Sequence, residues 1–577
     1  MKNRSTGQKI AIFACIGILV FFVVFVGVSI TQELGDSDSD KKDITTPEES
    51  AAHVEDVGKE LDELLSGVKT QEVTPQKAPV SDEDILSEDE ELPDIGKYPL
   101  SVTGSGKINV EIFSSPEKAG SGLDGWLNDA AESFNSKGYT IGQKTISVSV
   151  RSVSSGLAYD YIKSGKYVPD AISPSNEFWG SMLNASGVKT ELIEKKLCGN
   201  VAGILFTKEK YRDMIDKYGA VNMKVISQTT ANGELLMGYT NPFVSSTGLN
   251  FLVNTLYTYD TDDLLSEKAA EGFRSFQLNV PLVSYNTLQM RKAAESGTLD
   301  AMVMEYQQYN NDATLKNNYV FTPFGVRHDS PLYSLGTLSA EKTEVLKKFA
   351  QFCLSEEQQK AASECGFNKN EKYVSELPSN IKGDILIQAQ RLYKENKNSG
   401  KNIVAVFVAD ISGSMNGEPI NSLKTSLINS MQYISRDNYV GLISYSNKVN
   451  INLPIAKFDL NQQAYFKGAV QSLSANGQTA TYDALLVAVD MLRKAAKDMP
   501  DAKPMIFLLS DGEQNVGYSL NEIEDIISTY EMPVYTIGYN ANIEALKKVS
   551  EINEAATINA ESDDIAYQLK NLFNSEM

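Results

Sequence analysis

The segment FVADISGSMNG, residues 407–417, carries three short oxygen-bearing side chains at alternate positions. These are Asp410, Ser412 and Ser414, and they come directly after an apolar run. Gly413 and Gly417 allow the loop to turn tightly, so both hydroxyls can point at one centre. One carboxylate and two hydroxyls supply half of the octahedral oxygen shell that a hard cation such as Mg²⁺ takes.

Two later loops offer the remaining oxygens. NGQTATYDAL places Thr479 just ahead of an expected helix, and PMIFLLSDGEQN places Asp511 directly after an apolar strand. Ligands gather at the carboxyl ends of strands in such sheets, where these loops would meet. Capping and turn formation without a metal is the alternative, because Asp and Ser favour turns. We predict a site for Mg²⁺ or Mn²⁺ formed by Asp410, Ser412, Ser414, Thr479 and Asp511.

With these three loops in this order, residues 400–577 resemble the von Willebrand factor type A (VWA) family with an intact metal-ion-dependent adhesion site. The resemblance implies that Ser412, Ser414 and Thr479 bind the metal through hydroxyls, while Asp410 and Asp511 act directly or through water. Three neutral ligands leave the cation incompletely neutralised. An acidic group of a partner protein is then the expected sixth ligand.

The apolar strands of this region lack alternation, which is typical of strands buried on both faces. They are IVAVFVA, VGLISYS, PMIFLLS and PVYTIGY, with VNINL as a hairpin partner of the second. We expect helices at residues 420–433, 462–473, 480–496 and 564–573. This predicts an α/β domain, an open doubly wound (Rossmann-like) sheet.

Residues 106–395 also alternate between strands and helices, in two successive sets. The strands include INVEIF and ISVSVRSV in the first set and VAGILFT, LLMGYT and AMVMEY in the second. This alternation predicts mostly parallel α/β sheets. Two such units indicate two lobes with a cleft between them.

Hydroxyl-rich loops follow several of these strands: SSPEKAGSG, SVSSG and NPFVSSTG. Their hydroxyls can cap helices or bind an anion at helix N-termini, and the residues alone leave both readings open. With VPDAISPSN and GTLDAMVMEYQ, the region resembles type 2 periplasmic solute-binding proteins. The resemblance implies a cleft for a small solute or oxyanion, lined by Ser114, Ser115, Ser154, Ser155, Ser245, Ser246 and Thr247, with Tyr306 near the hinge-side strand. Lys118 is the one basic residue of these loops, so the ligand stays open.

The N-terminal 105 residues predict a membrane anchor and a stalk. Residues 10–30 run 21 residues without a charge, enough for one transmembrane helix, and a cleaved signal peptide is the alternative. Lys2, Arg4 and Lys9 precede this span, so residues 1–9 are expected in the cytoplasm and the rest outside. From Asp36 to Asp94 there are 20 Asp and Glu against 5 Lys and Arg, so residues 31–105 are expected to form an extended, disordered acidic stalk. Residues 54–65 could form one amphipathic helix within it, with too few apolar residues to build a core.

Composition excludes several classes of protein. The chain of 577 residues, net charge −22, is too long for one core and has no basic stripe, so we expect no nucleic-acid partner. Two histidines leave little material for a zinc site or a His-based triad. Ser186 and Lys189 match a Ser-x-x-Lys spacing without its companion motifs, so no enzyme is expected. Pairing among Cys198, Cys353 and Cys365 stays open.

We therefore predict a single-pass membrane protein whose extracytoplasmic bulk binds a partner protein through Mg²⁺ and, through the cleft, a small solute. One alternative is the substrate-capture component of a transporter complex. Another is an adhesin whose cleft is vestigial.

Overall fold

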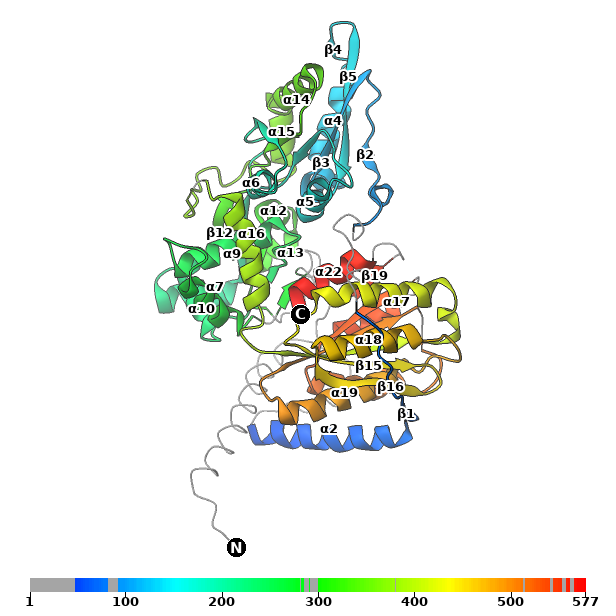
Figure 1. The fold of residues 1–577 in the computed structure, drawn as a ribbon. Coiled ribbons are helices and arrows are strands. Elements are labelled where there is room, and N and C mark those ends of the chain that lie inside the picture. The colour runs from blue at the N-terminus through cyan, green and yellow to red at the C-terminus, as the bar shows by residue number, and fades with distance from the viewer. Residues whose placement is uncertain are drawn as a thin grey trace.

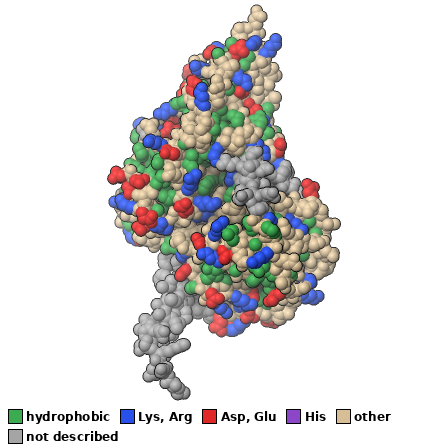
Figure 2. Space-filling model, viewed as in Figure 1, with side chains coloured by type: hydrophobic (Ala, Val, Ile, Leu, Met, Phe, Trp, Pro, Cys, Tyr) green, Lys and Arg blue, Asp and Glu red, His purple; other side chains and the backbone are tan. Residues whose placement is uncertain are grey.

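The computed structural model divides the chain into two parts, which lie one above the other in Figure 1 with the C-terminus at their junction; Figure 2 shows the same view as a space-filling model. The structure describes residues 47–80, 92–280, 282–284, 290, 299–378, 380–511, 514–539, 543–552, 557–560 and 565–577. The tail and span expected at residues 1–30 lie outside these ranges. Within them, no helix combines the length and apolar character needed to cross a bilayer.

The upper part, the two-lobed module, covers residues 92–396 and has a separate sheet in each lobe. In lobe 1 the strand order is β2-β5-β3-β6-β13-β7, with β4 paired to β5. Its strands are β2 (Leu100–Val102), β3 (Ile108–Ser114), β4 (Thr140–Ile141), β5 (Lys144–Ser152), β6 (Ala171–Ser173), β7 (Thr190–Glu194) and β13 (Leu332–Leu335). Its helices are α3 (Pro116–Ala119), α4 (Trp126–Ser136), α5 (Ser155–Ser164), α6 (Phe178–Ala185), α14 (Ala340–Cys353) and α15 (Glu356–Glu364).

Lobe 2 has the strand order β10-β9-β11-β8-β12. Its strands are β8 (Val201–Thr207), β9 (Met237–Thr240), β10 (Leu282–Ser284), β11 (Ala301–Glu305) and β12 (Tyr319–Arg327). Its helices are α7 (Lys208–Tyr218), α8 (Met223–Ala231), α9 (Ser246–Tyr259), α10 (Glu267–Gln277), α12 (Tyr306–Asn311) and α13 (Ala313–Asn318). The chain crosses between lobes after β7 and after β12, and α16 (Gly383–Asn396) packs on α6 of lobe 1 and on α9 and α10 of lobe 2. The expected two-lobed architecture is confirmed. The expectation of mostly parallel sheets is wrong here, because β2, β7, β8, β12 and β13 all pair antiparallel with their neighbours.

The lower part, the C-terminal domain, has a sheet in the order β1-β16-β15-β14-β17-β18-β19. Its strands from residue 403 onward are β14 (Ile403–Asp410), β15 (Tyr439–Tyr445), β16 (Val449–Lys457), β17 (Lys503–Ser510), β18 (Val534–Tyr539) and β19 (Thr557–Ala560). Its helices are α17 (Glu418–Ser430), α18 (Leu460–Ser472), α19 (Thr481–Asp498), α20 (Leu520–Thr529), α21 (Ile543–Glu551) and α22 (Ile565–Glu576). The central strands pair in parallel, and β15 and β16 form the expected antiparallel hairpin.

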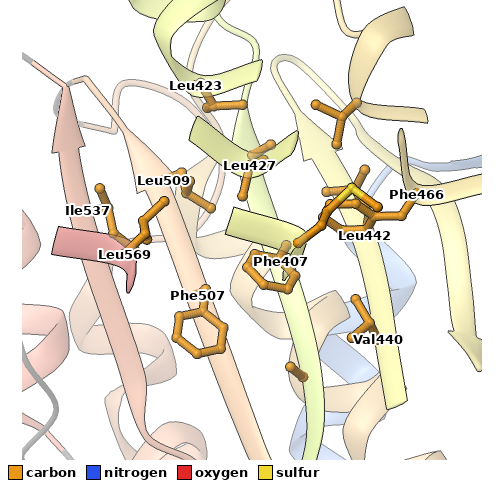
Figure 3. Close-up of a cluster of buried hydrophobic side chains, with 14 of the residues drawn as sticks. Phe407, Leu423, Leu427, Val440, Leu442, Phe466, Phe507, Leu509, Ile537 and Leu569 are labelled. Carbon is orange, nitrogen blue, oxygen red and sulfur yellow. The ribbon is translucent and has the colours of Figure 1, made fainter. Parts of the chain in front are cut away.

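Both faces of this sheet are buried, because every residue of β14 is buried and its side chains alternate between two cores. One core lies under α17, α18 and α22. Figure 3 shows it, with Phe407 and Phe507 from the sheet beside Phe466 and Leu569 from the helices. The other core lies under α19, α20 and α21. The strands without alternation therefore form the doubly wound sheet that was expected.

The expectation of an extended stalk at residues 31–105 is wrong for the part that the structure describes. Residues 47–67 form helix α2 (Pro47–Gly67), which packs on α19 and α20, and β1 (Thr70–Glu72) adds a parallel edge strand beside β16. Val57 and Leu61 are buried in the second core, while Asp62 on the outer side pairs with Arg493 at 2.5 Å. The apolar stripe of α2 thus finds its partner more than 400 residues later in the chain. The C-terminal domain is consequently built from two stretches of chain, with the two-lobed module between them.

Helix α22 lies where the three units meet. Its Phe573 packs edge-on against Phe407 and Phe507 in the core of the C-terminal domain. Its backbone accepts hydrogen bonds from Asn241 Nδ2 of lobe 2, at 3.2 Å, and from Lys397 Nζ, at 2.9 Å. On the lobe 1 side, Lys570 Nζ lies 3.5 Å from Asp160 Oδ2. One helix therefore joins the C-terminal domain to both lobes.

Candidate metal site

The expected metal-binding residues converge at the carboxyl edge of the C-terminal sheet. Asp410 is the last residue of β14, and Asp511 directly follows the neighbouring strand β17. Ser412 and Ser414 lie in the loop after β14, where residues 413–415 form a single 3-10 turn. This loop is held against the loop that precedes α19, because Gly413 N donates to Gly477 O at 2.9 Å.

Three of the oxygens form a row, in which each lies within hydrogen-bond distance of the next. Ser412 Oγ lies 2.9 Å from Ser414 Oγ, and Ser414 Oγ lies 2.9 Å from Asp511 Oδ1. In an octahedron with metal–oxygen bonds of ~2.0 to 2.1 Å, neighbouring oxygens lie about 2.9 Å apart; calcium bonds of ~2.3 to 2.6 Å would give about 3.3 to 3.7 Å. These spacings are also those of O–H···O hydrogen bonds, so they place the oxygens close enough to share one ion but do not distinguish Mg²⁺ from Ca²⁺.

Asp410 and Thr479 are held by neighbouring residues, two of which, Ser510 and Asn515, were not singled out from the sequence. Asp410 accepts hydrogen bonds from Ser412 N at 2.8 Å and from Ser510 Oγ at 2.6 Å. Asn515 accepts from Thr479 N at 2.9 Å, and its Nδ2 lies 3.5 Å from Thr479 Oγ1. Ser510 directly precedes Asp511, and Asn515 follows it in the same loop. Their closeness to Asp511 in the sequence was the only signal that could have identified them.

Burial shifts the pKa values of both carboxyl groups of the site upward. Burial raises the pKa of the Asp410 carboxyl, and the hydrogen bonds from Ser510 and Ser412 offset only part of that effect. Burial also raises the pKa of Asp511. A cation would reverse both shifts, because an adjacent positive charge favours the ionised carboxylate. Ser414 is exposed, so this side of the site is open to a partner.

Among the described residues of the candidate metal site, the groups that could bind a metal are carboxylates and hydroxyls. Within the described part of the chain, no group of three or more His, Cys, Asp and Glu side chains is arranged to hold a metal. Cys198, Cys353 and Cys365 are free thiols, the first two buried. Thiolate or imidazole ligation therefore has no support among these residues, whereas hydroxyl ligation does.

The serines expected to line the cleft lie between the lobes, but most of their hydroxyls are engaged within the protein. Ser246 Oγ donates to Ser155 Oγ of the facing lobe at 3.0 Å and accepts from Trp179 Nε1 at 2.8 Å. Ser154 and Ser245 cap α5 and α9. The lobes are in direct contact at this place.

Thr247 and Tyr306 belong to the lobe 2 side. Thr247 Oγ1 donates to Glu305 Oε1 at 3.3 Å. Glu305 Oε1 also lies 2.9 Å from His328 Nδ1. The Tyr306 ring packs edge-on against Phe321. The structure thus uses Tyr306 in an aromatic cluster beside the hinge strands.

Two cleft hydroxyls have no hydrogen-bond partner among the described residues, although both are buried: Ser114 Oγ and Ser173 Oγ. They are register partners at the ends of β3 and β6. Beside them, the buried Lys118 donates to Ser115 and lies 3.5 Å from Glu117 Oε1. Burial opposes ionisation of Glu117, but Lys118 and hydrogen bonds from nearby serines hold its pKa below its usual value. The ammonium group is therefore already paired.

Comparison with known proteins assigns a family of domains to each part. Residues 405–575 match the von Willebrand factor type A domain, and residues 119–368 match the bacterial extracellular solute-binding protein family. The chain therefore contains a solute-binding-like region and a VWA-like region. Both are binding or adhesion types of domain rather than catalytic ones, which fits a protein that is not an enzyme.

The curated relatives match over a limited length. Inter-alpha-trypsin inhibitor heavy chain H3 of Bos taurus is 30% identical over 149 residues, which is 24% of this chain and 16% of that protein. An uncharacterized protein of Synechocystis sp., sll0103, is 28% identical over 135 residues, or 23% of this chain and 31% of its own length. The human voltage-dependent calcium channel subunit alpha-2/delta-2 is 26% identical over 148 residues, or 25% and 12%. The chain therefore spans less than a third of each of these relatives.

Solved structures overlap with each part separately. A von Willebrand factor type A protein from Catenulispora acidiphila, 18% identical, has a TM-score of 0.28 and covers 30% of this chain and 42% of its own. A periplasmic thiamin binding protein, 12% identical, has a TM-score of 0.36 and covers 52% of this chain and 98% of its own. Overlaps at this level support no conclusion about function.

Proposed function

We propose that the protein binds an acidic group of a partner protein through a Mg²⁺ ion, with Mn²⁺ as a substitute, held by Asp410, Ser412, Ser414, Thr479 and Asp511. The observation that carries this proposal is the convergence of the Ser412, Ser414 and Asp511 oxygens, each 2.9 Å from the next, at the sheet edge where Asp410 ends β14. Two carboxylates at most balance the ion, and hydroxyl ligands add no charge. A carboxylate from the partner completes both the coordination and the charge.

Calorimetric titration of Mg²⁺ tests the metal site. The wild-type chain should bind the ion, and Asp511→Ala should lose measurable binding because one of the two carboxylates is gone. Asp501→Ala is the matched control, since Asp501 is exposed and lies just before β17 while Asp511 follows it. Equal Mg²⁺ affinity in the wild type and Asp511→Ala would remove the proposal.

A second candidate function is binding of a small solute or anion between the lobes. The unpartnered, buried hydroxyls of Ser114 and Ser173 support it, because buried polar groups normally have partners. A thermal-shift screen of anions, sugars and amino acids tests it, since a ligand of the native state raises the melting temperature. A stabilising ligand whose effect disappears in Ser173→Ala would support a capture role, such as that of a transporter component. No stabilisation by any of these classes would favour an adhesin with a vestigial cleft.

Residues 10–30 are proposed to anchor the protein, with the bulk outside the cell membrane. Residues 31–46 separate this span from α2, and sixteen residues reach at most about 55 Å when fully extended. Because α2 packs on the C-terminal domain, that domain would lie nearest the membrane. Protease digestion of intact cells tests this topology: the C-terminal domain should be cleaved, and its complete protection would contradict the proposed orientation.

A further inference from the structure

A groove of about 690 Å³, lined mostly by residues with polar side chains, lies beside the metal-site loop of the C-terminal domain. Four pieces of chain form it: the N-terminal segment around β1, Ile411 of the metal-site loop, the β15–β16 hairpin, and the end of α18 with the loop after it. One wall is therefore contributed by the stretch of chain that precedes the two-lobed module.

The groove begins at the metal-site loop itself. Ile411 lies between Asp410 and Ser412 and lines the groove, and Asn476 N donates to its carbonyl at 2.8 Å. Gly477, whose carbonyl holds Gly413, lines the groove as well. The groove therefore adjoins the loop that carries Asp410, Ser412 and Ser414.

The charge of the groove is unusual for a chain of net charge −22. Lys69 and Lys448 line it, and its lining includes no Asp or Glu. Lys448 Nζ donates to Gln71 across the groove wall, and among the described residues neither lysine pairs with a carboxylate. The surface therefore favours an acidic occupant.

Side-chain amides supply the remaining contacts. Asn447, Asn450, Asn452 and Asn476 all line the groove. Asn447 is bonded to Gln478 through both its Nδ2 and its Oδ1, and Asn450 Nδ2 donates to Ser444 Oγ, so Asn452 and Asn476 offer the amides for a ligand. Asn452 is the extra residue of a bulge in β16, because Leu442 pairs with Leu453 and the next residue, Ile443, pairs with Ile451. Its side chain is 6% exposed and its Oδ1 has no partner among the described residues. Bulges of this kind re-aim side chains beside functional sites.

We propose that this groove binds an extended, acidic segment of the partner protein, next to the carboxylate that the metal site takes. The amides of Asn452 and Asn476 would bind the segment's main chain, which offers donors and acceptors regardless of sequence, and the two lysines would favour Asp and Glu side chains. This inference rests on the proposed function, because the metal site fixes where the segment enters. The groove adds the class of partner: a strand-like acidic peptide segment.

The test is a selection of random peptides of about a dozen residues, long enough to span some 40 Å when extended, on the purified full chain with Mg²⁺. Peptides that bind should share one acidic residue, which would reach the metal site. They should also carry further acidic residues to one side of it in the peptide sequence, which would lie in the groove. Lys69→Glu combined with Lys448→Glu should weaken the selected peptides at least about tenfold while Mg²⁺ affinity stays unchanged. Asn452→Ala should weaken them without a charge change.

Lys497→Glu is the control, since Lys497 is exposed on α19 and does not line the groove. Equal loss in this control would indicate a general charge effect and overturn the inference. It is equally overturned if Mg²⁺-dependent peptides ignore the groove substitutions, or if Mg²⁺ binds but no peptide does. Failure of the proposed function looks different: calorimetry then detects no Mg²⁺ binding. In that case, peptides whose binding still depends on Lys69 and Lys448 would support the groove as a binding surface. Peptides whose binding does not depend on these two lysines would overturn it.

Discussion

The integration of α2 into the C-terminal domain predicts a large effect of Leu61→Ala. Leu61 is fully buried and belongs to the core under α19 and α20, and its helix α2 lies on the side of the C-terminal domain away from the two-lobed module (Figure 1). Truncating a buried Leu to Ala costs roughly 2 to 5 kcal/mol, because apolar contacts are lost and a cavity remains. Taking about 3 kcal/mol, and about 2 to 4 °C per kcal/mol for a domain of this size, the melting temperature should fall by roughly 6 to 12 °C.

The two tryptophans allow this effect to be assigned to one domain. Trp126 and Trp179 are the only tryptophans of the chain, and both are buried in the two-lobed module. Scanning calorimetry should show the lowered transition, while the transition followed by tryptophan fluorescence should move much less. Leu460→Ala is the matched control, because Leu460 lies in the same domain and is 58% exposed.

A free stalk gives a different result. If residues 47–80 did not pack on the sheet, Leu61→Ala would behave as a surface substitution, within about 0.5 kcal/mol of the wild type. A melting temperature equal to that of Leu460→Ala would therefore refute the integration of α2. Loss of both transitions together would instead show that the module and the C-terminal domain unfold as one unit.

Three further predictions concern the module and its attachment. Gly156→Val should push the lobes apart and increase the radius of gyration in X-ray scattering, because a Cβ at Gly156 would lie 2.2 Å from a carbonyl oxygen of the facing lobe; unchanged scattering would contradict this. Lys570→Ala and Asp160→Ala should each cost less than about 1 kcal/mol, since the pair is partly exposed, and a double-mutant cycle should give a coupling of the same small size. Iodoacetamide should label Cys365 before Cys198, because burial raises the pKa of the Cys198 thiol to about 12; mass spectrometry that finds the reverse order would refute the packing around Cys198.

The sequence predicted the C-terminal sheet and the metal-site loops because their signals are local. Asp410, Ser412 and Ser414 sit within five residues, directly after a strand whose continuous apolar character allows only a doubly buried position. Asp511 follows another such strand, so the parallel pairing of β14 and β17 brings the two loops together. The structure adds that Ser510 and Asn515 hold these residues in place.

The N-terminal segment could not be predicted in the same way. The apolar residues of α2, among them Val57, Leu61 and Leu65, follow a helical spacing, but the segment has an excess of Asp and Glu typical of solvated chains. Its partner helices α19 and α20 begin at residues 481 and 520, so nothing local shows what the stripe packs against. In the cleft the difficulty is the reverse. Ser and Thr before helices cap backbone N–H groups whether or not a ligand binds, and Ser154 and Ser245 do so here.

The order of the chain restricts how the two-lobed module can move relative to the metal site. The chain forms α2 and β1 in the C-terminal domain, continues along α18, where Ala78 N donates to Ala464 O at 2.9 Å, and returns after α16 into β14. The module is thus attached at both of its ends, and α22 adds a third attachment that reaches each lobe. A tether at one end would allow free rotation, whereas attachment at both ends and through a packed helix does not. Separation of the lobes must therefore displace α22 or break its contacts, and α22 packs on the same strands, β14 and β17, whose ends carry Asp410 and Asp511.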